Sequence, residues 1–210
     1  MSTAKKPSKI VILALGNPGE EYEDTYHNAG TIALPAIIRT LTGEDAAALA
    51  WRTHRHLFEY APAGNFIFAR SLTYMNESGL AAAEALKKFG IQLDHFVVVH
   101  DESDLTVGNC KVSFDRSSGG HKGVESIQKM LRTRDFVRVR IGISPRTPRG
   151  KARKPDSDDV IDFVLGRFKS SEAERLKSAQ ALALDALHLL LTEGLPRAMT
   201  EINARDRTKR

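Results

Sequence analysis

The stretch Ile10-Val11-Ile12-Leu13-Ala14-Leu15-Gly16-Asn17-Pro18-Gly19 is an apolar run that ends abruptly in a turn. Short apolar runs bounded by Gly and Pro are typical of buried β-strands, so we predict a strand over residues 9–15. Asn17 then stands just beyond the carboxyl end of that strand. Ligand clefts of α/β proteins form along this edge of the sheet.

The rest of the chain alternates between apolar runs and segments with helical periodicity, a pattern typical of an α/β fold. We expect Ser78 to cap one helix, and Ser171 with Glu174 to form a capping box at another. Arg138 and Arg140 share one face of the last predicted strand, so we expect that face not to be entirely core. The other predicted strands cover residues 57–60, 66–70, 96–100, 112–114 and 136–143. The predicted helices cover residues 30–41, 79–89, 124–131 and 171–192. Residues 144–158 are predicted to be a mobile loop.

Length and composition favour one globular domain, because the chain has 210 residues, of which 41% are hydrophobic and 27% charged. We divide it into a basic N-terminal extension (1–8), an α/β domain (9–200) and a basic C-terminal tail (201–210). No apolar run is long enough to span a membrane, and the N-terminus lacks a signal-peptide pattern. The single cysteine, Cys110, excludes an internal disulfide and favours a reducing compartment, so we expect a cytoplasmic protein.

The net charge of +5 favours a polyanionic partner. Lysine and arginine gather at both ends of the chain and within residues 146–154. Such runs are also common in solvated loops and tails. Composition therefore permits a nucleic-acid partner without establishing one.

Four polar residues follow the predicted strands or their turns: Asn17, His27, Asn76 and Asp101. A neutral histidine can take a proton from water near pH 7, and a carboxylate on its far ring nitrogen would fix the tautomer. Asparagine amides can donate hydrogen bonds to a developing oxyanion. Because no Gly-x-Ser-x-Gly elbow is present, water is the favoured nucleophile. This set indicates hydrolytic acyl chemistry without a metal.

Each of these residues also has an ordinary structural interpretation. A lone histidine is more often structural than catalytic, and asparagine and aspartate commonly stabilise turns. The segment His54-Arg55-His56 suggests a metal, but its histidines lack the i,i+4 spacing of a helical metal site. We therefore expect neither a metal nor a cofactor.

Several motifs in one order resemble the bacterial-type peptidyl-tRNA hydrolase family. The match covers roughly residues 9–200. Its segments are Leu15-Gly16-Asn17-Pro18-Gly19 with Tyr22 and His27-Asn28, then Tyr74-Met75-Asn76-Glu77-Ser78-Gly79, then His100-Asp101-Glu102-Ser103-Asp104-Leu105, then Gly120-His121-Lys122-Gly123, Arg138-Val139-Arg140-Ile141-Gly142-Ile143 and Phe163-Val164-Leu165-Gly166.

The resemblance implies a compact, monomeric α/β domain with a mixed, mostly parallel twisted sheet flanked by helices. It implies hydrolysis of the ester that joins a peptide to the 3′-terminal ribose of tRNA, which recycles tRNA. It implies no metal or cofactor. By motif position, His27 is the general base and Asp101 its orienting partner. The residues expected to contact the substrate are Asn17, Tyr22, Met75, Asn76 and Lys122. The residues expected to contact tRNA phosphates are Lys111, Arg116 and Arg140.

The chain departs from the family pattern at several places, one of which is Asp115-Arg116-Ser117-Ser118, where the family has mostly glycines. Tyr26 stands where the family usually has arginine, and Lys122 stands where it usually has asparagine. A lysine cannot accept a hydrogen bond, but Lys122 can bind phosphate or stabilise an oxyanion, and close to His27 it would lower the pKa of that residue. Ser113 replaces a basic residue, for which Arg116 compensates in our interpretation.

Two other functions remain open on the sequence alone. A catalytically inactive RNA-binding relative, comparable to splicing factors that resemble this family, would use the fold without hydrolysis. An esterase for a small acylated substrate would use the same catalytic group but would leave the basic charge unexplained. Retention of His27 and Asp101 favours the hydrolase.

Overall fold

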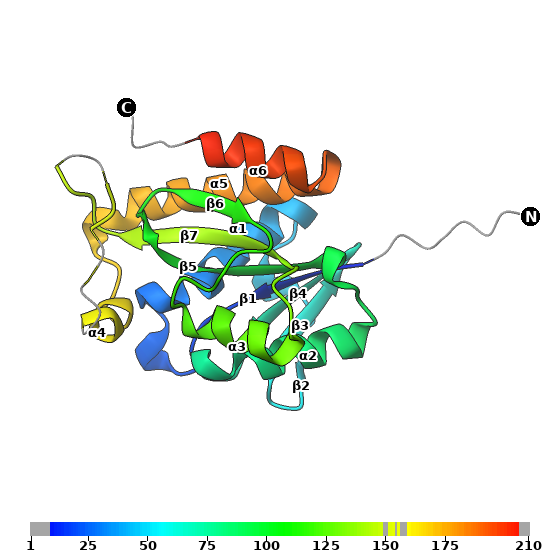
Figure 1. Cartoon of the computed structure of the whole chain (residues 1–210). Helices are drawn as coiled ribbons and strands as arrows, with labels where there is room; N and C mark the ends of the chain where they lie inside the picture. The colour runs from blue at the N-terminus through cyan, green and yellow to red at the C-terminus, as the bar shows by residue number, and fades with distance from the viewer. Residues whose placement is uncertain (1–8, 149–150, 154, 156–158, 206–210) are drawn as a thin grey trace, which may run out of the picture.

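The computed structural model describes residues 9–148, 151–153, 155 and 159–205, which form a seven-stranded mixed sheet between two layers of helices (Figure 1). The strand order is β2-β3-β4-β1-β5-β7-β6. Strand β1 pairs in parallel with both β4 and β5, and β5 pairs in parallel with β7, while β2, β3 and β6 run antiparallel to their neighbours. The strands are β1 (Ile10–Ala14), β2 (Arg52–His54), β3 (Phe58–Ala63), β4 (Phe66–Ser71), β5 (Phe96–Thr106), β6 (Cys110–Ser113) and β7 (Val137–Ser144).

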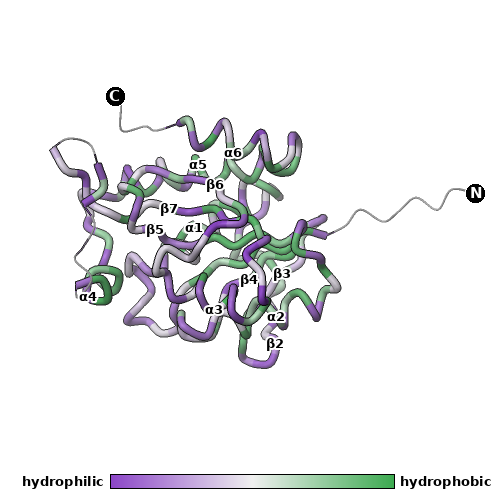
Figure 2. Tube along the Cα trace, in the orientation of Figure 1, coloured by the Kyte–Doolittle hydropathy of each residue, from purple (hydrophilic) through white to green (hydrophobic). Residues whose placement is uncertain are grey.

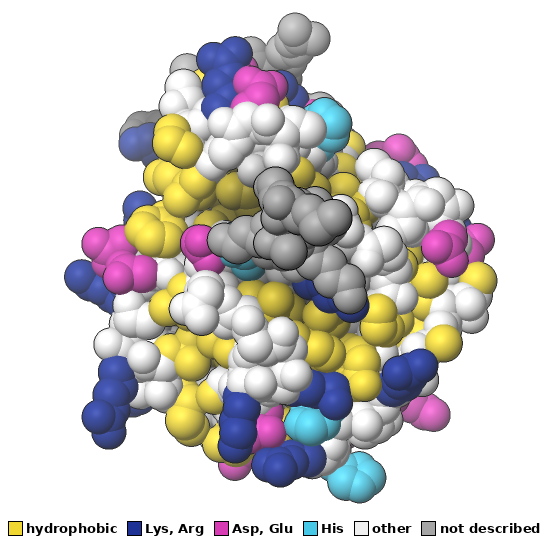
Figure 3. Space-filling view, turned by 90° about the vertical axis from the view of Figure 1, so that its right-hand side faces the viewer, with side chains coloured by type: hydrophobic (Ala, Val, Ile, Leu, Met, Phe, Trp, Pro, Cys, Tyr) yellow, Lys and Arg dark blue, Asp and Glu magenta, His cyan; other side chains and the backbone are white. Residues whose placement is uncertain are grey.

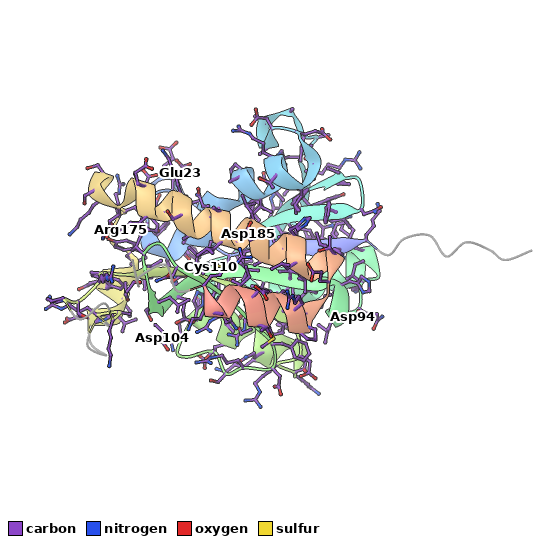
Figure 4. All side chains as sticks on the ribbon, turned by 90° about the horizontal axis from the view of Figure 1, so that it is seen from above. Glu23, Asp94, Asp104, Cys110, Arg175 and Asp185 are labelled. Atoms are coloured by element: carbon purple, nitrogen blue, oxygen red, sulfur yellow. The ribbon has the colours of Figure 1, made fainter. Side chains whose placement is uncertain are left out.

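Helices α1 (Ala29–Thr42), α5 (Ala173–Thr192) and α6 (Leu195–Ala204) cover one face of the sheet. Helices α2 (Ser78–Phe89) and α3 (Lys122–Leu131) cover the other face, and the short α4 (Val160–Val164) lies at one end. Figure 4 looks down on α5 and α6, which cross the sheet side by side.

The central position of strand β1 in the sheet explains why its sequence is apolar without interruption. Ile12 and Ala14 pack toward α1 and α5, whereas Val11 and Leu13 pack toward α2 and α3, and all four are fully buried. A central parallel strand is covered on both faces, so both sets of alternating side chains are apolar. Figure 2 shows the resulting hydrophobic band through the middle of the molecule. The predicted α/β class and mixed sheet are confirmed.

The prediction for β7 was wrong in one respect. Arg138 and Arg140 do share a face, but both are buried, with 1% and 5% of their surface exposed. The alternating residues Val137, Val139 and Ile141 face the α5 layer. Period-2 alternation identified the two faces, but it could not show that loops and ion pairs cover the polar one.

The predicted helix caps were also wrong. Ser78 is the first residue of α2, and its hydroxyl donates to the carbonyl of Met75 at 2.8 Å. Helix α5 begins at Ala173 without a side-chain cap, and the capping box belongs to the preceding 3₁₀ turn, where the carboxylate of Glu172 accepts from the backbone N–H of Lys169 at 2.9 Å. Both patterns marked the right neighbourhood but the wrong residue.

The sequence did not predict β2, α4 or α6, and β5 extends beyond the expected residues 96–100. Helix α6 begins with Pro196 in its first turn, so this proline starts a helix instead of only ending one. The basic extension 1–8 and residues 206–210 of the predicted tail lie outside the described residues, as does part of the predicted loop 144–158. Within that loop, Arg146 and Ala152 form an isolated β-bridge.

No helix in the described part of the chain is long and apolar enough to cross a membrane. Figure 3 views the end of the sheet at which β1 begins. Basic, acidic and apolar side chains are mixed on this face. The candidate site lies at the opposite end, where the parallel strands finish.

Candidate active site

A cleft of about 630 Å³ opens at the carboxyl ends of the parallel strands. Because β4 and β5 lie on opposite sides of β1, the connections leaving this edge diverge, and such switch points form ligand crevices. All seven residues predicted for catalysis or substrate contact line the cleft. They are Asn17, Tyr22, His27, Met75, Asn76, Asp101 and Lys122.

His27 sits in a 3₁₀ turn immediately before α1. Gly30, in the first turn of α1, lets this segment pack directly on the sheet, because a Cβ there would collide with the carbonyl of Val99. The preceding Tyr26 is buried, stacks on Phe163 with ring centroids 5.2 Å apart, and donates its hydroxyl to Glu172 at 2.8 Å. The residue that departs from the family pattern thus anchors the turn that carries His27.

Asp101 lies on β5 beyond the last residue paired with β1 and is 2% exposed. Its two carboxylate oxygens each lie 3.0 Å from Nδ1 of His27. This contact makes Nδ1 the protonated nitrogen of His27, and Nε2 is then the unprotonated nitrogen that can accept a proton.

His121 completes this group, although it was not among the residues predicted for the site. Its Nε2 lies 2.6 Å from Oδ1 of Asp101. Its Nδ1 accepts from the backbone N–H groups of Gly123 and Val124, at 3.1 and 3.3 Å, and so caps the N-terminus of α3. Because Nδ1 is an acceptor, Nε2 carries the proton that Asp101 accepts. The Gly120-His121-Lys122-Gly123 motif was the available signal.

The electrostatics of the group follow from burial and pairing. Burial alone would lower the pKa of His27, but the charge of Asp101 and their hydrogen bond raise it above the usual 6.5. Burial alone would raise the pKa of Asp101, but His27 and His121 hold it well below its usual range. Asp101 is therefore ionised at neutral pH. Lys122 was expected to lower the His27 pKa only if it lay close to His27, and its exposed ammonium is instead directed to Glu125.

Asn17 is held by backbone contacts on both sides. Its Oδ1 accepts from the N–H of Met75 at 2.8 Å. Its own N–H donates to Oδ1 of Asn28 at 2.8 Å, and the amide of Asn28 donates back to the carbonyl of Asn17 at 3.0 Å. With Oδ1 occupied, the Nδ2 donors of Asn17 remain for a ligand.

The other predicted substrate contacts are less constrained. Asn76 is exposed at the cleft, and its side chain makes no hydrogen bond within the described residues. Lys122 is the first residue of α3, with 70% of its side chain exposed and its ammonium 3.6 Å from Glu125. Tyr22 and Met75 complete this wall, and Met75 is buried.

A second cavity of about 540 Å³ contains the three predicted phosphate contacts, Lys111, Arg116 and Arg140, together with Ser113 and Phe114. We call it the basic pocket. Within the described residues, Lys111 and Arg116 have no ion-pair partner. Arg140 differs, because its guanidinium lies 2.7 Å from the buried carboxylate of Glu102.

His27, Asp101 and His121 also form the group of possible metal ligands found in the described residues, with ligand atoms within 4.8 Å of one another. However, the histidine nitrogens that face Asp101 lie at hydrogen-bonding distance from its oxygens, and the backbone contacts of His121 make its Nε2 a donor. A metal would have to displace both protons. We interpret the group as a hydrogen-bonded network.

Comparison with known proteins places this architecture. Residues 11–210 match the family model described as peptidyl-tRNA hydrolase. The peptidyl-tRNA hydrolase of Cutibacterium acnes is 35% identical over 207 residues, covering 94% of this chain and 99% of that protein. The enzyme of Bifidobacterium animalis subsp. lactis is 32% identical over 203 residues, covering 93% and 97%.

The crystal structure of peptidyl-tRNA hydrolase from Acinetobacter baumannii superposes with a TM-score of 0.80 at 27% identity, covering 96% of this chain and 97% of that one. Both the sequence and the fold therefore agree along almost the whole chain. The protein belongs to the peptidyl-tRNA hydrolase family.

Proposed function

We propose that this protein hydrolyses the ester between a peptide, or an N-blocked aminoacyl group, and the 3′-terminal ribose of tRNA. The observation that carries this proposal is the contact of His27 with Asp101 at the wall of a cleft that also presents Asn17 and Asn76. The adjacent basic pocket supports a polyanionic substrate. Family membership supports the choice of ester.

In the proposed reaction, Nε2 of His27 removes a proton from water while the water oxygen bonds to the ester carbonyl carbon. The imidazolium that forms is stabilised by Asp101. Collapse of the tetrahedral intermediate breaks the bond to the ribose 3′-oxygen, which takes the proton from His27. The products are tRNA with a free 3′-hydroxyl and a peptide carboxylic acid, which releases its proton to solvent and leaves as the carboxylate.

The two asparagines have separate parts in this scheme. Since Oδ1 of Asn17 is bonded to Met75, its Nδ2 can only donate, which suits a peptide carbonyl or the developing oxyanion. Asn76 retains both donor and acceptor and suits the peptide backbone. Recognition of the backbone would allow the side chains of the peptide to vary.

The test is release of N-acetyl-aminoacyl groups from tRNA by the unmodified protein and by His27→Ala. We expect cleavage to fall by at least about 10²–10⁴-fold in the variant, with tRNA binding retained. Tight tRNA binding without cleavage by the unmodified protein would instead support the inactive RNA-binding relative. Cleavage of small acyl esters but not of acylated tRNA would support the esterase.

We also propose that the protein acts without a metal, as a monomer, in the cytoplasm. The hydrogen-bonded protons between Asp101 and its two histidines support a metal-free reaction. Treatment with a chelator, followed by dialysis into buffer containing the Mg²⁺ that tRNA needs, should leave kcat unchanged. Loss of activity that only Zn²⁺ restores would overturn this part of the proposal.

A further inference from the structure

Arg138 is a buried cation that forms no ion pair within the described residues, although the charge of Glu102 acts on it at longer range. It is 1% exposed, and no carboxylate within the described residues lies at ion-pair distance from it. Burial, followed by the charge of Arg140, lowers its pKa to about 10, so it is still charged at neutral pH. A buried unpaired charge costs free energy, so its position calls for a function.

All of the hydrogen bonds that Arg138 makes within the described residues go to one loop. Nη2 of Arg138 donates to the carbonyl of Arg116 at 2.6 Å and to that of Ser117 at 3.2 Å. In the described part of the chain, its Nε has no hydrogen-bond partner, and neither has the buried hydroxyl of Ser113, which stands opposite Arg138 on β6. Among the described residues, Arg138 therefore donates hydrogen bonds only to the middle of the segment between β6 and α3.

We call residues 114–121 the connecting loop, because its two ends line different cavities. Phe114, Asp115 and Arg116 line the basic pocket with Lys111 and Arg140. Gly119, Gly120 and His121 line the catalytic cleft, where His121 donates to Asp101. The loop thus carries a cation at one end and a partner of the catalytic carboxylate at the other.

The sheet beneath the loop joins the same two cavities. Glu102 lines the cleft, its ion-pair partner Arg140 lines the basic pocket, and Asp104 lines both. The distance between the cavities is therefore set by β5 and β7, the strands that carry Glu102 and Arg140. Arg138, on β7, ties the loop to this frame.

We propose that Arg138 is a positioning residue that holds the connecting loop so that Arg116 meets a tRNA phosphate while His121 stays on Asp101. This inference rests on the proposed function. It assigns one buried residue two separable effects, one on the salt dependence of tRNA binding and one on the protonation of His27.

The charged and titratable groups around His27 decide the second effect. Asp101 and His121 contact it directly, and Tyr22, Glu102, Asp104 and Lys122 line the same cleft. When His121 leaves Asp101, the carboxylate loses one donor and interacts more strongly with the imidazolium of His27. Release of the loop therefore shifts the acid limb of the pH–rate profile to higher pH.

The experiment compares Arg138→Met, Arg138→Lys, His121→Ala and Arg116→Ala. Methionine matches the volume of the buried stem and removes the uncompensated charge, which favours retention of the fold. We expect Arg138→Met to lower kcat on N-acetyl-aminoacyl-tRNA by about 10–100-fold. We also expect it to shift the acid limb of the pH–rate profile to higher pH, as His121→Ala does. We also expect its salt slope to fall as in Arg116→Ala, by roughly one phosphate contact. Arg138→Lys should restore part of both effects.

The double variant Arg138→Met/His121→Ala should show no further shift of the acid limb. Loss of active protein that moves neither the pH limb nor the salt slope would show a purely structural role and overturn the proposal. A change in only one of the two readouts would also overturn it. If the unmodified protein does not cleave its substrate, the proposed function fails, but NMR titration of His27 and salt-dependent tRNA binding still test Arg138.

Discussion

The catalytic cleft and the basic pocket differ in how firmly their polar side chains are held. In the cleft, Asn17, His27 and His121 are each held by hydrogen bonds to backbone or to Asp101. In the basic pocket, the charged groups of Lys111 and Arg116 have no ion-pair partner within the described residues. A fixed group suits charge that develops at one point, whereas a free cation suits a polyanion. We expect changes in the cleft to affect kcat and changes in the pocket to affect KM and salt dependence.

The substitution with the largest expected effect is Asp101→Asn. The new amide nitrogen would face Nδ1–H of His27 at about 3.0 Å, which puts donor against donor. His121 cannot relieve this, because Gly123 and Val124 fix its tautomer. The one remaining acceptor, Oδ1, must then serve both Nε2–H of His121 and Nδ1–H of His27, and the negative charge that stabilises the imidazolium of His27 is gone. We expect kcat to fall by about 10³–10⁴-fold with KM nearly unchanged.

Steady-state kinetics on N-acetyl-aminoacyl-tRNA measures this effect. The matched control is Asp94→Asn, an exposed aspartate on the loop before β5, which should leave kcat unchanged. A kcat for Asp101→Asn within tenfold of the unmodified value would contradict the assigned tautomers.

The pH dependence should show the raised pKa of His27 directly. The base must be neutral, so kcat/KM should fall about tenfold per unit below that pKa, which lies above 6.5. The same shift stabilises the fold fully below the unfolded pKa of His27, and this contribution is lost as pH rises through the folded pKa. NMR titration of the His27 ring measures the value. An acid limb clearly below 6.5 would show that Asp101 does not hold His27 as described.

The basic pocket is tested by Lys111→Ala and Arg116→Ala. Each removes a cation that has no partner within the described residues, so the fold loses little. We expect KM to rise several-fold at low salt, kcat to stay nearly constant, and the slope of log KM against log salt to fall by roughly 0.7–0.9 per residue. Lys87→Ala, an exposed lysine on α2, is the matched control. A fall in kcat without a change in salt slope would erase the distinction between the two regions.

The residues predicted from the sequence line both the cleft and the pocket, but the contact of His121 with Asp101 was not predicted. Asn17 and Asp101 follow apolar runs, and parallel strands bring their carboxyl ends to one edge, so spacing alone places them together. His121 was missed because its role depends on a loop that returns to β5, which no local pattern records. The motif that contains it was visible, but its contact with Asp101 was not.

The two arginines of β7 show the same limit. Alternation assigned Arg138 and Arg140 to one face, and polarity suggested that the face was partly exposed. Burial of that face depends on Glu102, 38 residues away from Arg140, and on the connecting loop, which supplies carbonyls to Arg138. Side chains define the faces of a strand, but distant segments decide what covers them.

The smallest effect is expected for Tyr26→Phe, which tests a contact next to the cleft and not in it. The hydroxyl of Tyr26 donates to Glu172, whose same oxygen still accepts from Lys169 when the hydroxyl is removed. The loss should be about 1 kcal/mol, or a fall in Tm of roughly 2–4 °C for a chain of this size. Because the ring still stacks on Phe163, His27 should keep its place and kcat should change less than threefold.

Tyr60→Phe is the matched control, since Tyr60 is also buried but lies on β3 and has no hydrogen bond from its hydroxyl within the described residues. Thermal unfolding and kinetics on the same samples separate the two effects. Equal Tm values for both variants would show that the bond to Glu172 does not support the fold. A large loss of kcat with an unchanged Tm would show that the Tyr26 hydroxyl supports catalysis directly, because activity would then be lost without any loss of fold stability.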